Sequence, residues 1–318
     1  MSIIELKHVT RLFLVHERKG VFRRERRTVE AVRDISFSIA PGEFVGYLGA
    51  NGAGKSTTIK MLTGILAPSS GEIRVCGKDP FRSRREIAYH FGAMFGQRMQ
   101  LWWDLPLIDS FDQLHYIYRV PDDQYRARLA ELVEILDLSS FLKVAVRQLS
   151  LGQRIRGELA AAMIHTPAIL FLDEPTIGLD LVAKERVREF LTQINRRHGI
   201  TIMLTTHDMA DLERMCSRLI VLADGQTVSD GPLDELFGAY KLERTLTVDL
   251  SEPCESMIIP GARSVSVDGP RQVFRFVAQD LSSADLIAQV AARAKIIDLT
   301  LKEPDVEDLV RAITKAES

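Results

Sequence analysis

The chain has 318 residues, 46% of them hydrophobic and 26% charged, and its net charge is −2. This composition is typical of a globular protein with a sizeable core and argues against global disorder. The balanced charge argues against a protein that binds nucleic acid through a basic surface overall. Three cysteines lie far apart without a Cys-x-x-Cys pair, which argues against a disulfide framework or a zinc site. No stretch approaches the roughly 18 to 20 apolar residues of a membrane span, so membrane association is expected to come through a partner.

The N-terminal region is predicted to form two strands. Ile3, Leu6 and Val9 sit among polar residues, and a second alternating stretch follows at 35–40. Between them, residues 16–30 carry six basic side chains: Arg18, Lys19, Arg23, Arg24, Arg26 and Arg27. We predict a solvated loop here. The alternative is a basic hairpin that approaches acidic lipid headgroups or a partner.

The central region alternates strands with helices. A buried strand at 43–48 runs through a Gly-rich turn into a helix at 55–66, and residues 104–141 are predicted to be mainly helical. Further along, helices are predicted at 152–165, 182–198 and 208–216, and strands at 168–172, 200–205 and 218–223. This alternation predicts an α/β core with a largely parallel sheet.

The pattern restarts near residue 240. Short strands at 245–250, 263–267 and 273–277 precede a helix at 282–294, a strand at 295–301 and a last helix. We therefore predict two domains, a nucleotide-binding domain at 1–238 and a small accessory α/β domain at 241–318.

The Gly-rich turn has the sequence GANGAGKS, which fits the pattern GxxxxGK[ST] between a strand and a helix. Glycines in such a turn let backbone N–H groups point at phosphate oxygens, and the positive end of the following helix faces the same phosphates. Lys55 is predicted to reach the β- and γ-phosphates of ATP, and Ser56 to ligate Mg²⁺. The candidate residues of this turn are Gly49, Asn51, Gly52, Gly54, Lys55, Ser56 and Thr57.

Two carboxylates, Asp173 and Glu174, follow an apolar run at 169–172. Ligands of parallel sheets lie beyond the carboxyl ends of the strands, so Asp173 is predicted to hold Mg²⁺ and Glu174 to polarise the attacking water. Alone, such a pair would fit an ordinary loop equally well. An activated water beside the γ-phosphate also argues against a nucleotide kinase.

Four further motifs follow in a fixed order: Gln97 within FGQRMQLWWDLP, LSLGQ at 149–153, IGLD at 177–180 and His207 within LTTHDM. Together with the turn and the acid pair, they resemble the ATP-binding cassette (ABC) ATPases over residues 3 to 235. The resemblance implies a P-loop NTPase fold of ABC type, with a mixed sheet and an inserted helical subdomain at about 98–165.

The resemblance also implies roles for single residues. Gln97 would contact Mg²⁺ and water in the Q-loop, and His207 would be the switch histidine. The signature residues Ser150, Gly152 and Gln153 would contact the γ-phosphate, Asp180 would belong to the D-loop, and Phe13 would stack on adenine. Leu151 replaces the first glycine of the family's LSGGQ, and activity is expected to survive this change.

Each of these residues has an ordinary structural alternative. Gln97 could be a surface glutamine, His207 a capping or core histidine, and Phe13 a core residue. Asp180 would also serve as the N-cap of the helix at 182–198.

The chain has one P-loop and one signature, and in ABC ATPases the signature of one cassette closes over the ATP of another. The resemblance therefore implies a homodimer with two ATP sites. It further implies a permease that docks near Gln97–Pro106, at the cytoplasmic face of the membrane, although Trp102 and Trp103 could instead be core residues. The motifs look most like those of bacterial exporters with separately encoded permeases. The alternatives are a soluble ABC ATPase acting on ribosomes or nucleic acid, for which no basic domain is present, and a nucleotide sensor without turnover.

Overall fold

The computed structural model describes residues 2–19, 23–95 and 99–316. The chain divides into two compact units, Met1–Leu233 (unit 1) and Asp234–Ser318 (unit 2). The boundary predicted from the sequence lies slightly further along the chain, because helix α8 (Leu233–Ala239) belongs mainly to unit 2. None of the helices in the described ranges has the length and hydrophobicity of a membrane span.

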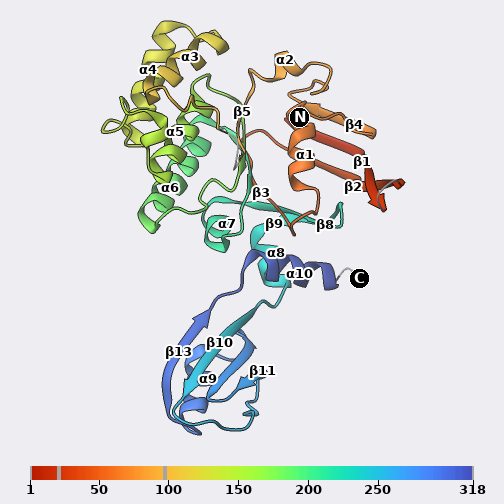
Figure 1. Cartoon of the computed structure of the whole chain (residues 1–318), viewed down its shortest axis with the longest axis vertical. Coiled ribbons are helices and arrows are strands. Elements are labelled where there is room, and N and C mark those ends of the chain that lie inside the picture. The colour runs from red at the N-terminus through yellow and green to blue at the C-terminus, as the bar shows by residue number, and fades with distance from the viewer. Residues whose placement is uncertain (1, 20–22, 96–98, 317–318) are drawn as a thin grey trace. The chain divides into compact units, whose positions relative to one another are not determined.

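A six-stranded sheet forms the centre of unit 1 (Figure 1). Its strand order is β5 (Phe91–Met94), β6 (Ile169–Asp173), β7 (Thr201–Thr205), β3 (Phe44–Gly49), β8 (Arg218–Ala223) and β9 (Gln226–Pro232). Neighbouring strands are parallel except at β9, which runs antiparallel to β8. Strands β3 and β7 are buried at every position, as expected for strands covered on both faces. The carboxyl ends of β3, β6 and β7 therefore meet at one edge of the sheet.

The connecting helices of the core are α1 (Lys55–Leu62), α6 (Leu181–His198) and α7 (Met209–Met215). The region predicted to be a helical subdomain contains α3 (Leu107–Tyr118), α4 (Asp122–Ile135), the 3₁₀ turn η1 (Val146–Gln148) and α5 (Leu151–Met163). A short helix, α2 (Arg84–Ile87), precedes β5. Strands alternating with helices thus build the mixed α/β core predicted from the sequence.

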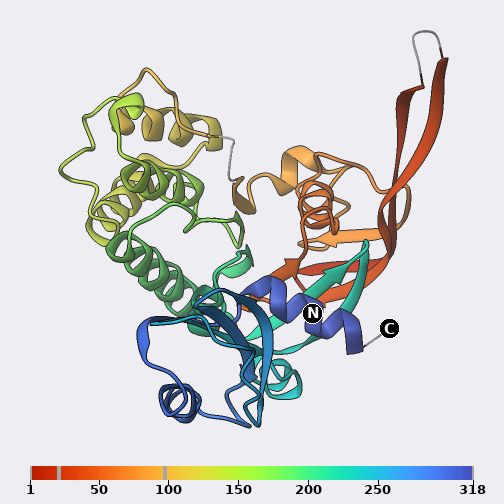
Figure 2. The same cartoon turned by 60° about the horizontal axis from the view of Figure 1, so that its bottom comes forward.

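The prediction of a loop at 16–30 is wrong for the described residues of that segment, 16–19 and 23–30. Strands β1 (Ile4–Lys19) and β2 (Arg23–Ile39) pair antiparallel up to Lys19 and Arg23, and the hairpin extends away from the rest of unit 1 (Figure 2). Strand β4 (Ser70–Val75) pairs with β1 only as far as Thr10. Beyond Thr10 the two strands form an outer ribbon that β4 does not cover. In this outer ribbon even Leu14 is 70% exposed, so no buried face imposes the alternating pattern from which strands are predicted.

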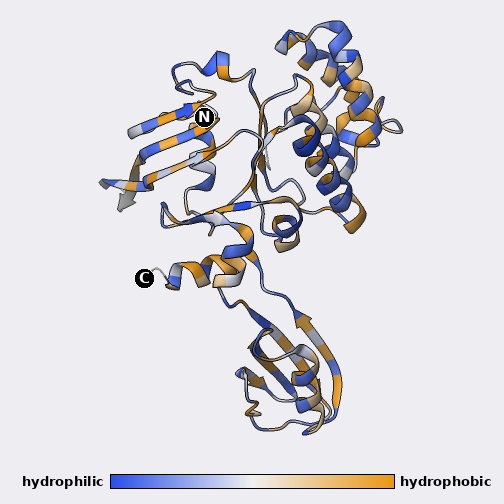
Figure 3. Cartoon of the chain, turned by 180° about the vertical axis from the view of Figure 1, so that it is seen from behind, coloured by the Kyte–Doolittle hydropathy of each residue, from blue (hydrophilic) through white to orange (hydrophobic). Residues whose placement is uncertain are grey.

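Unit 2 contains a four-stranded antiparallel sheet with the order β11 (Ala262–Asp268), β12 (Arg271–Val277), β10 (Glu243–Leu250) and β13 (Ile296–Lys302). Apolar and polar residues are interleaved along its strands (Figure 3). The apolar side chains on one face, including Leu246, Phe274 and Phe276, form a core with Leu286 and Val290 of α9 (Ser283–Ala291). The last helix is α10 (Val306–Ala316).

Candidate active site

The turn between β3 and α1 depends on its glycines. Gly52 and Gly54 have φ values of 88° and 103°, a region that disfavours other residues. A Cβ atom on Gly54 would lie 2.6 Å from the carbonyl oxygen of Ala31, whereas one on Gly52 would meet nothing within 4 Å. Gly54 therefore allows close packing against β2, and Gly52 leaves open space in front of the turn.

Lys55 begins α1, and its side chain folds back across the turn. Its Nζ donates hydrogen bonds to the carbonyl oxygens of Gly49, at 2.5 Å, and Ala50, at 3.2 Å. This position puts a positive charge beside the backbone N–H groups at the start of α1. Together they form a cradle suited to the oxygens of a phosphate.

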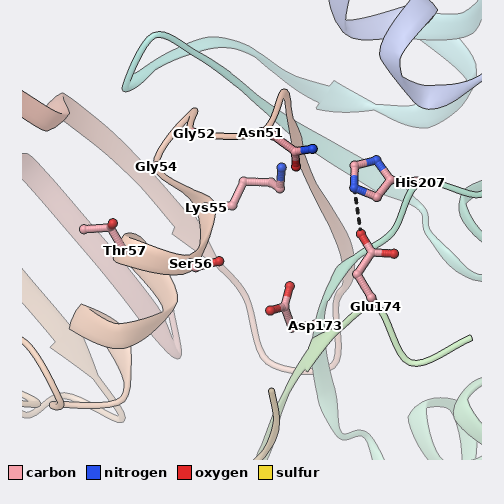
Figure 4. A pocket seen from close by; sticks show the side chains of 9 residues that line it. All are labelled: Asn51, Gly52, Gly54, Lys55, Ser56, Thr57, Asp173, Glu174 and His207. Carbon is pink, nitrogen blue, oxygen red and sulfur yellow. Dashed lines mark ion pairs between the residues drawn. The ribbon is translucent and has the colours of Figure 1, made fainter. Parts of the chain in front are cut away.

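Asp173 and Glu174 lie at the end of β6, opposite the cradle (Figure 4). The hydroxyl of Thr205 donates a hydrogen bond to Oδ1 of Asp173, and the N–H of Glu174 donates one to the carbonyl oxygen of Thr205. Strand β7 thus fixes both acids. Glu174 has a φ of 56°, an uncommon conformation for a non-glycine residue that turns the chain sharply after the strand.

Glu174 and His207 form a pair across the edge of the sheet. Nε2 of His207 lies 3.1 Å from Oε1 of Glu174 (Figure 4). Burial raises the pKa of Glu174 above its ordinary value, and His207 acts in the opposite direction. A carboxylate with a raised pKa is a better proton acceptor than an exposed one, so this pair is suited to activating a water molecule.

These groups line one cavity of about 300 Å³. Its described lining residues are Asn51, Gly52, Gly54, Lys55, Ser56, Thr57, Asp173, Glu174 and His207, all of which were candidates from the sequence. Ser56 and Asp173 offer the hard oxygen ligands that Mg²⁺ prefers. Within the described ranges no three His, Cys, Asp or Glu side chains could hold a metal by themselves. A magnesium ion would therefore take its other ligands from phosphate oxygens and water.

The signature residues are not among the described lining residues of this cavity. The Ser150 side chain accepts a hydrogen bond from the N–H of Gln153, and the Gln153 side chain accepts one from the N–H of Ser150, which closes a capping box at the start of α5. Ser150 and Leu151 are exposed, and Gly152 is half-buried. The start of α5 is therefore an exposed surface that is available to a group from outside this cavity.

Two other candidates also lie elsewhere. Asp180 caps α6, since its side chain accepts a hydrogen bond from the N–H of Ala183. Phe13 lies on β1 opposite Val29, with the guanidinium of Arg11 4.7 Å from its ring centroid. Gln97 is outside the described residues.

Sequence reasoning missed a buried polar network behind the site. The carboxylate of Asp211 on α7, which is fully buried, accepts hydrogen bonds from the hydroxyls of Thr176 and Thr206 and from Nε of Arg188 at 2.6 Å. Thr176 lies two residues after Glu174, and Thr206 directly precedes His207. The network thus joins the two segments that carry the catalytic candidates.

A phosphate cradle after β3, an acid pair after β6 and a histidine after β7 define a P-loop ATPase. Comparison with known proteins specifies the family. The family model described as "ABC transporter" matches residues 32–177. The chain is 32% identical over 222 residues to the ABC transporter ATP-binding protein NatA of Bacillus subtilis (strain 168), which covers 70% of this chain and 90% of that protein. The chain therefore belongs to the ABC transporter family, as an ATP-binding subunit with ABC-type ATPase activity.

Other relatives include exporters and importers. Nod factor export ATP-binding protein I of Paraburkholderia xenovorans (strain LB400) is 39% identical over 200 residues, covering 63% of this chain and 65% of that protein. The methionine import ATP-binding protein MetN of Latilactobacillus sakei subsp. sakei (strain 23K) is 33% identical over 229 residues, covering 71% and 66%. Among solved structures, the dimeric bacterial ABC transporter cassette MJ0796 matches with a TM-score of 0.60 and 27% identity, over 72% of this chain and 98% of that chain.

Proposed function

We propose that two copies of this chain form a homodimer that hydrolyses Mg²⁺-ATP at two equivalent shared sites and drives a separate permease. One observation carries the proposal. The cavity gathers the cradle, the acid pair and His207, while Ser150 stands exposed at the start of a different helix. A second copy can bring its own Ser150 to the open side of the cavity. The similarity to a dimeric cassette supports this arrangement.

Within each site the roles follow from position. Lys55 and the N–H groups of α1 bind the β- and γ-phosphates, and Ser56 and Asp173 hold the ion, which when bound neutralises charge on the phosphate oxygens. Glu174 accepts a proton from the attacking water. His207, 3.1 Å away, orients the carboxylate and that water. The exposed hydroxyl and N–H groups around Ser150 contact the γ-phosphate from the second copy, with Asp180 and Phe13 assigned to the D-loop and the adenine by resemblance.

The permease is proposed to dock at the segment 97–106. Trp102 and Trp103 are 38% and 45% exposed, so neither is a core residue of the helical subdomain, as the alternative would require. The carboxylate of Glu158 on α5 accepts hydrogen bonds from the backbone N–H groups of Gln100 and Leu101. Because α5 begins at the signature, a displacement of this segment by the permease would be transmitted to the signature through Glu158 and α5.

Export is the direction we favour, on the resemblance of the Q-loop and signature segments to exporters and on the 39% identity to an export protein. Transport into inside-out vesicles that contain the chain and its permease would support export, and release from them would contradict it. The competing function, an ABC ATPase working on ribosomes or nucleic acid, predicts that recovery of the chain with membranes does not depend on a co-expressed permease. We expect instead that the chain is recovered with membranes only when its permease is co-expressed, because we propose that it binds the permease at the cytoplasmic face.

Lys55→Ala should weaken ATP binding about 10- to 150-fold, because a hydrogen bond to a charged group contributes roughly 1.5 to 3 kcal/mol. Titration of a fluorescent ATP analogue would measure the dissociation constant. Lys60→Ala is the matched control, since Lys60 is exposed on the same helix and does not line the described cavity. Equal affinities of the Lys55→Ala variant and the parent would overturn the assignment of the cradle.

The shared site can be tested with single cysteines. In a background with Cys76, Cys216 and Cys254 replaced by serine, one chain carries Asn51→Cys and another Ser150→Cys, both at exposed positions. We expect oxidation with ATP to yield a disulfide-linked dimer that contains both variants. Either variant alone should yield little, and omission of ATP should reduce the yield. Equal crosslinking in all mixtures would contradict a site completed by a second copy.

A further inference from the structure

We propose that unit 2 contains a binding site for a phosphate-bearing anion, formed between the sheet face opposite α9 and helix α10. A cavity of about 260 Å³ lies here, lined by residues of β10, β11, β12 and α10. Five of its lining side chains are basic: Lys241, Arg263, Arg275, Arg311 and Lys315. Nothing in the ATPase mechanism uses them.

The register of the sheet places like charges side by side. Arg275 on β12 lies directly opposite Arg263 on β11 and, on its other side, opposite Thr245 on β10. Thr245 in turn lies opposite Lys302 on β13. Residues opposite each other share a face of the sheet, and like charges in that position destabilise the pairing. The repulsion between Arg263 and Arg275 therefore destabilises the sheet, and a bound anion would reduce this repulsion.

The acidic residues at the cavity do not neutralise it. Glu243 lies 3.3 Å from Arg263, and Asp308 lies 3.7 Å from Arg311. Arg275 and Lys315 have no ion pair within the described ranges, and both are half-buried or exposed toward the cavity that they line. A third basic lining residue, Lys241, is paired with Asp280 at 2.9 Å. Five basic lining residues thus face three acids, and the site has an excess of about two positive charges.

The ligand class follows from charge, shape and lining. An excess of about two positive charges suits a phosphate or diphosphate group better than a single carboxylate. Arginine presents a planar fork of N–H donors that matches phosphate oxygens. The described lining residues include no aromatic side chain, which gives a nucleotide base nothing to stack on. We therefore expect inorganic pyrophosphate, or the phosphoryl groups of a small molecule or a lipid headgroup.

The primary test is calorimetric titration of the full chain with inorganic pyrophosphate. Every sample carries Lys55→Ala, so that the ATP cradle contributes little. Arg275→Gln and Lys315→Gln should each raise the dissociation constant at least tenfold, and added salt should weaken binding further. Arg293→Gln is the matched control, since Arg293 is exposed beyond the end of α9 and does not line the cavity. The proposal would be overturned if the Arg275→Gln variant bound pyrophosphate as tightly as the parent. It would also be overturned if the parent bound neither pyrophosphate nor vesicles.

Thermal unfolding distinguishes a ligand site from a structural role. Without anion, Arg275→Gln should raise the unfolding temperature of unit 2 by about 1 to 4 °C, because it removes the repulsion from Arg263. With pyrophosphate, the parent should gain stability and the variant should not. A variant that is less stable without anion but gains as much from pyrophosphate as the parent would contradict the proposal.

Vesicle flotation separates a soluble ligand from a headgroup. If the ligand is soluble, pyrophosphate binds and vesicles containing phosphatidic acid do not carry the chain upward. If it is a headgroup, the vesicles carry the parent and Arg293→Gln chains but not the Arg275→Gln chain. Flotation that is the same for all three chains, without pyrophosphate binding, would overturn the proposal.

Discussion

Replacing Glu174 by glutamine is expected to lower ATP turnover by a factor of about 10² to 10⁴, the usual contribution of a positioned general base. The amide keeps the shape of the side chain and can still reach Nε2 of His207, now 3.1 Å from the carboxylate. It cannot accept the proton of the attacking water. Affinity for ATP should stay within about twofold, because Lys55 and the start of α1 hold the phosphates. Phosphate release and nucleotide titration measure the two quantities.

The same variant should accumulate as an ATP-bound dimer, because closure would no longer be followed by hydrolysis. Light scattering with and without ATP would detect the change in mass. Glu189→Gln serves as the control, since Glu189 is an exposed acid on α6 outside the described ATP cavity. Turnover at the parent rate in the Glu174→Gln variant would refute its assignment as the base.

Replacing Asp211 by alanine is expected to destabilise unit 1 by about 1 to 3 kcal/mol, the usual cost of leaving buried hydrogen-bonding groups without a partner. The charge of Arg188 keeps Asp208, at 3.3 Å, and Glu185, at 3.4 Å. Asp211 is fully buried and Arg188 is 5% exposed, so water cannot take the place of the lost carboxylate. Thr176 and Thr206 lose their acceptor at the same time. Urea unfolding, followed by a signal from unit 1, measures the change.

A double variant tests the physical cause. Replacing both partners, as Arg188→Met with Asp211→Leu, removes the buried Nε donor together with its acceptor and should recover part of the lost stability. If the network also orients the segments of Glu174 and His207, ATP turnover should be lower than in the parent in the Asp211→Ala variant, and it should stay low in the double variant. A single Asp211→Ala variant as stable as the parent would show that the buried pair contributes little.

The residues of the ATP cavity were predictable because local sequence determines them. The cradle lies within eight consecutive residues, and β3 and β6 are continuous apolar runs that end at the site. His207 follows a third buried strand, β7, and parallel strands bring their carboxyl ends together. The fold class was confirmed for the same reason, since alternating strands and helices specify a sheet of this kind.

The features that were missed depend on contacts between distant residues. Nothing near Asp211 in the sequence shows that Arg188, 23 residues earlier, will be buried against it. The basic cavity of unit 2 arises from the register between β11, β12 and β10, which charge composition does not reveal. The outer β1–β2 ribbon was predicted as a loop because its described side chains, such as Leu14 and Val15, are exposed on both faces, and an exposed ribbon needs no hydrophobic face.

That ribbon has a consequence for how the protein behaves at high concentration. Within the described residues beyond Leu12, β1 and β2 pair only with each other, so the outer edge of each strand has no neighbouring strand. Open edges of this kind are templates for edge-to-edge self-association of identical molecules. The sequence at 16–30 contains six arginines and lysines against three glutamates. Two copies that approach edge to edge therefore repel each other. The basic side chains that led to the prediction of a solvated loop thus oppose aggregation through the exposed hairpin.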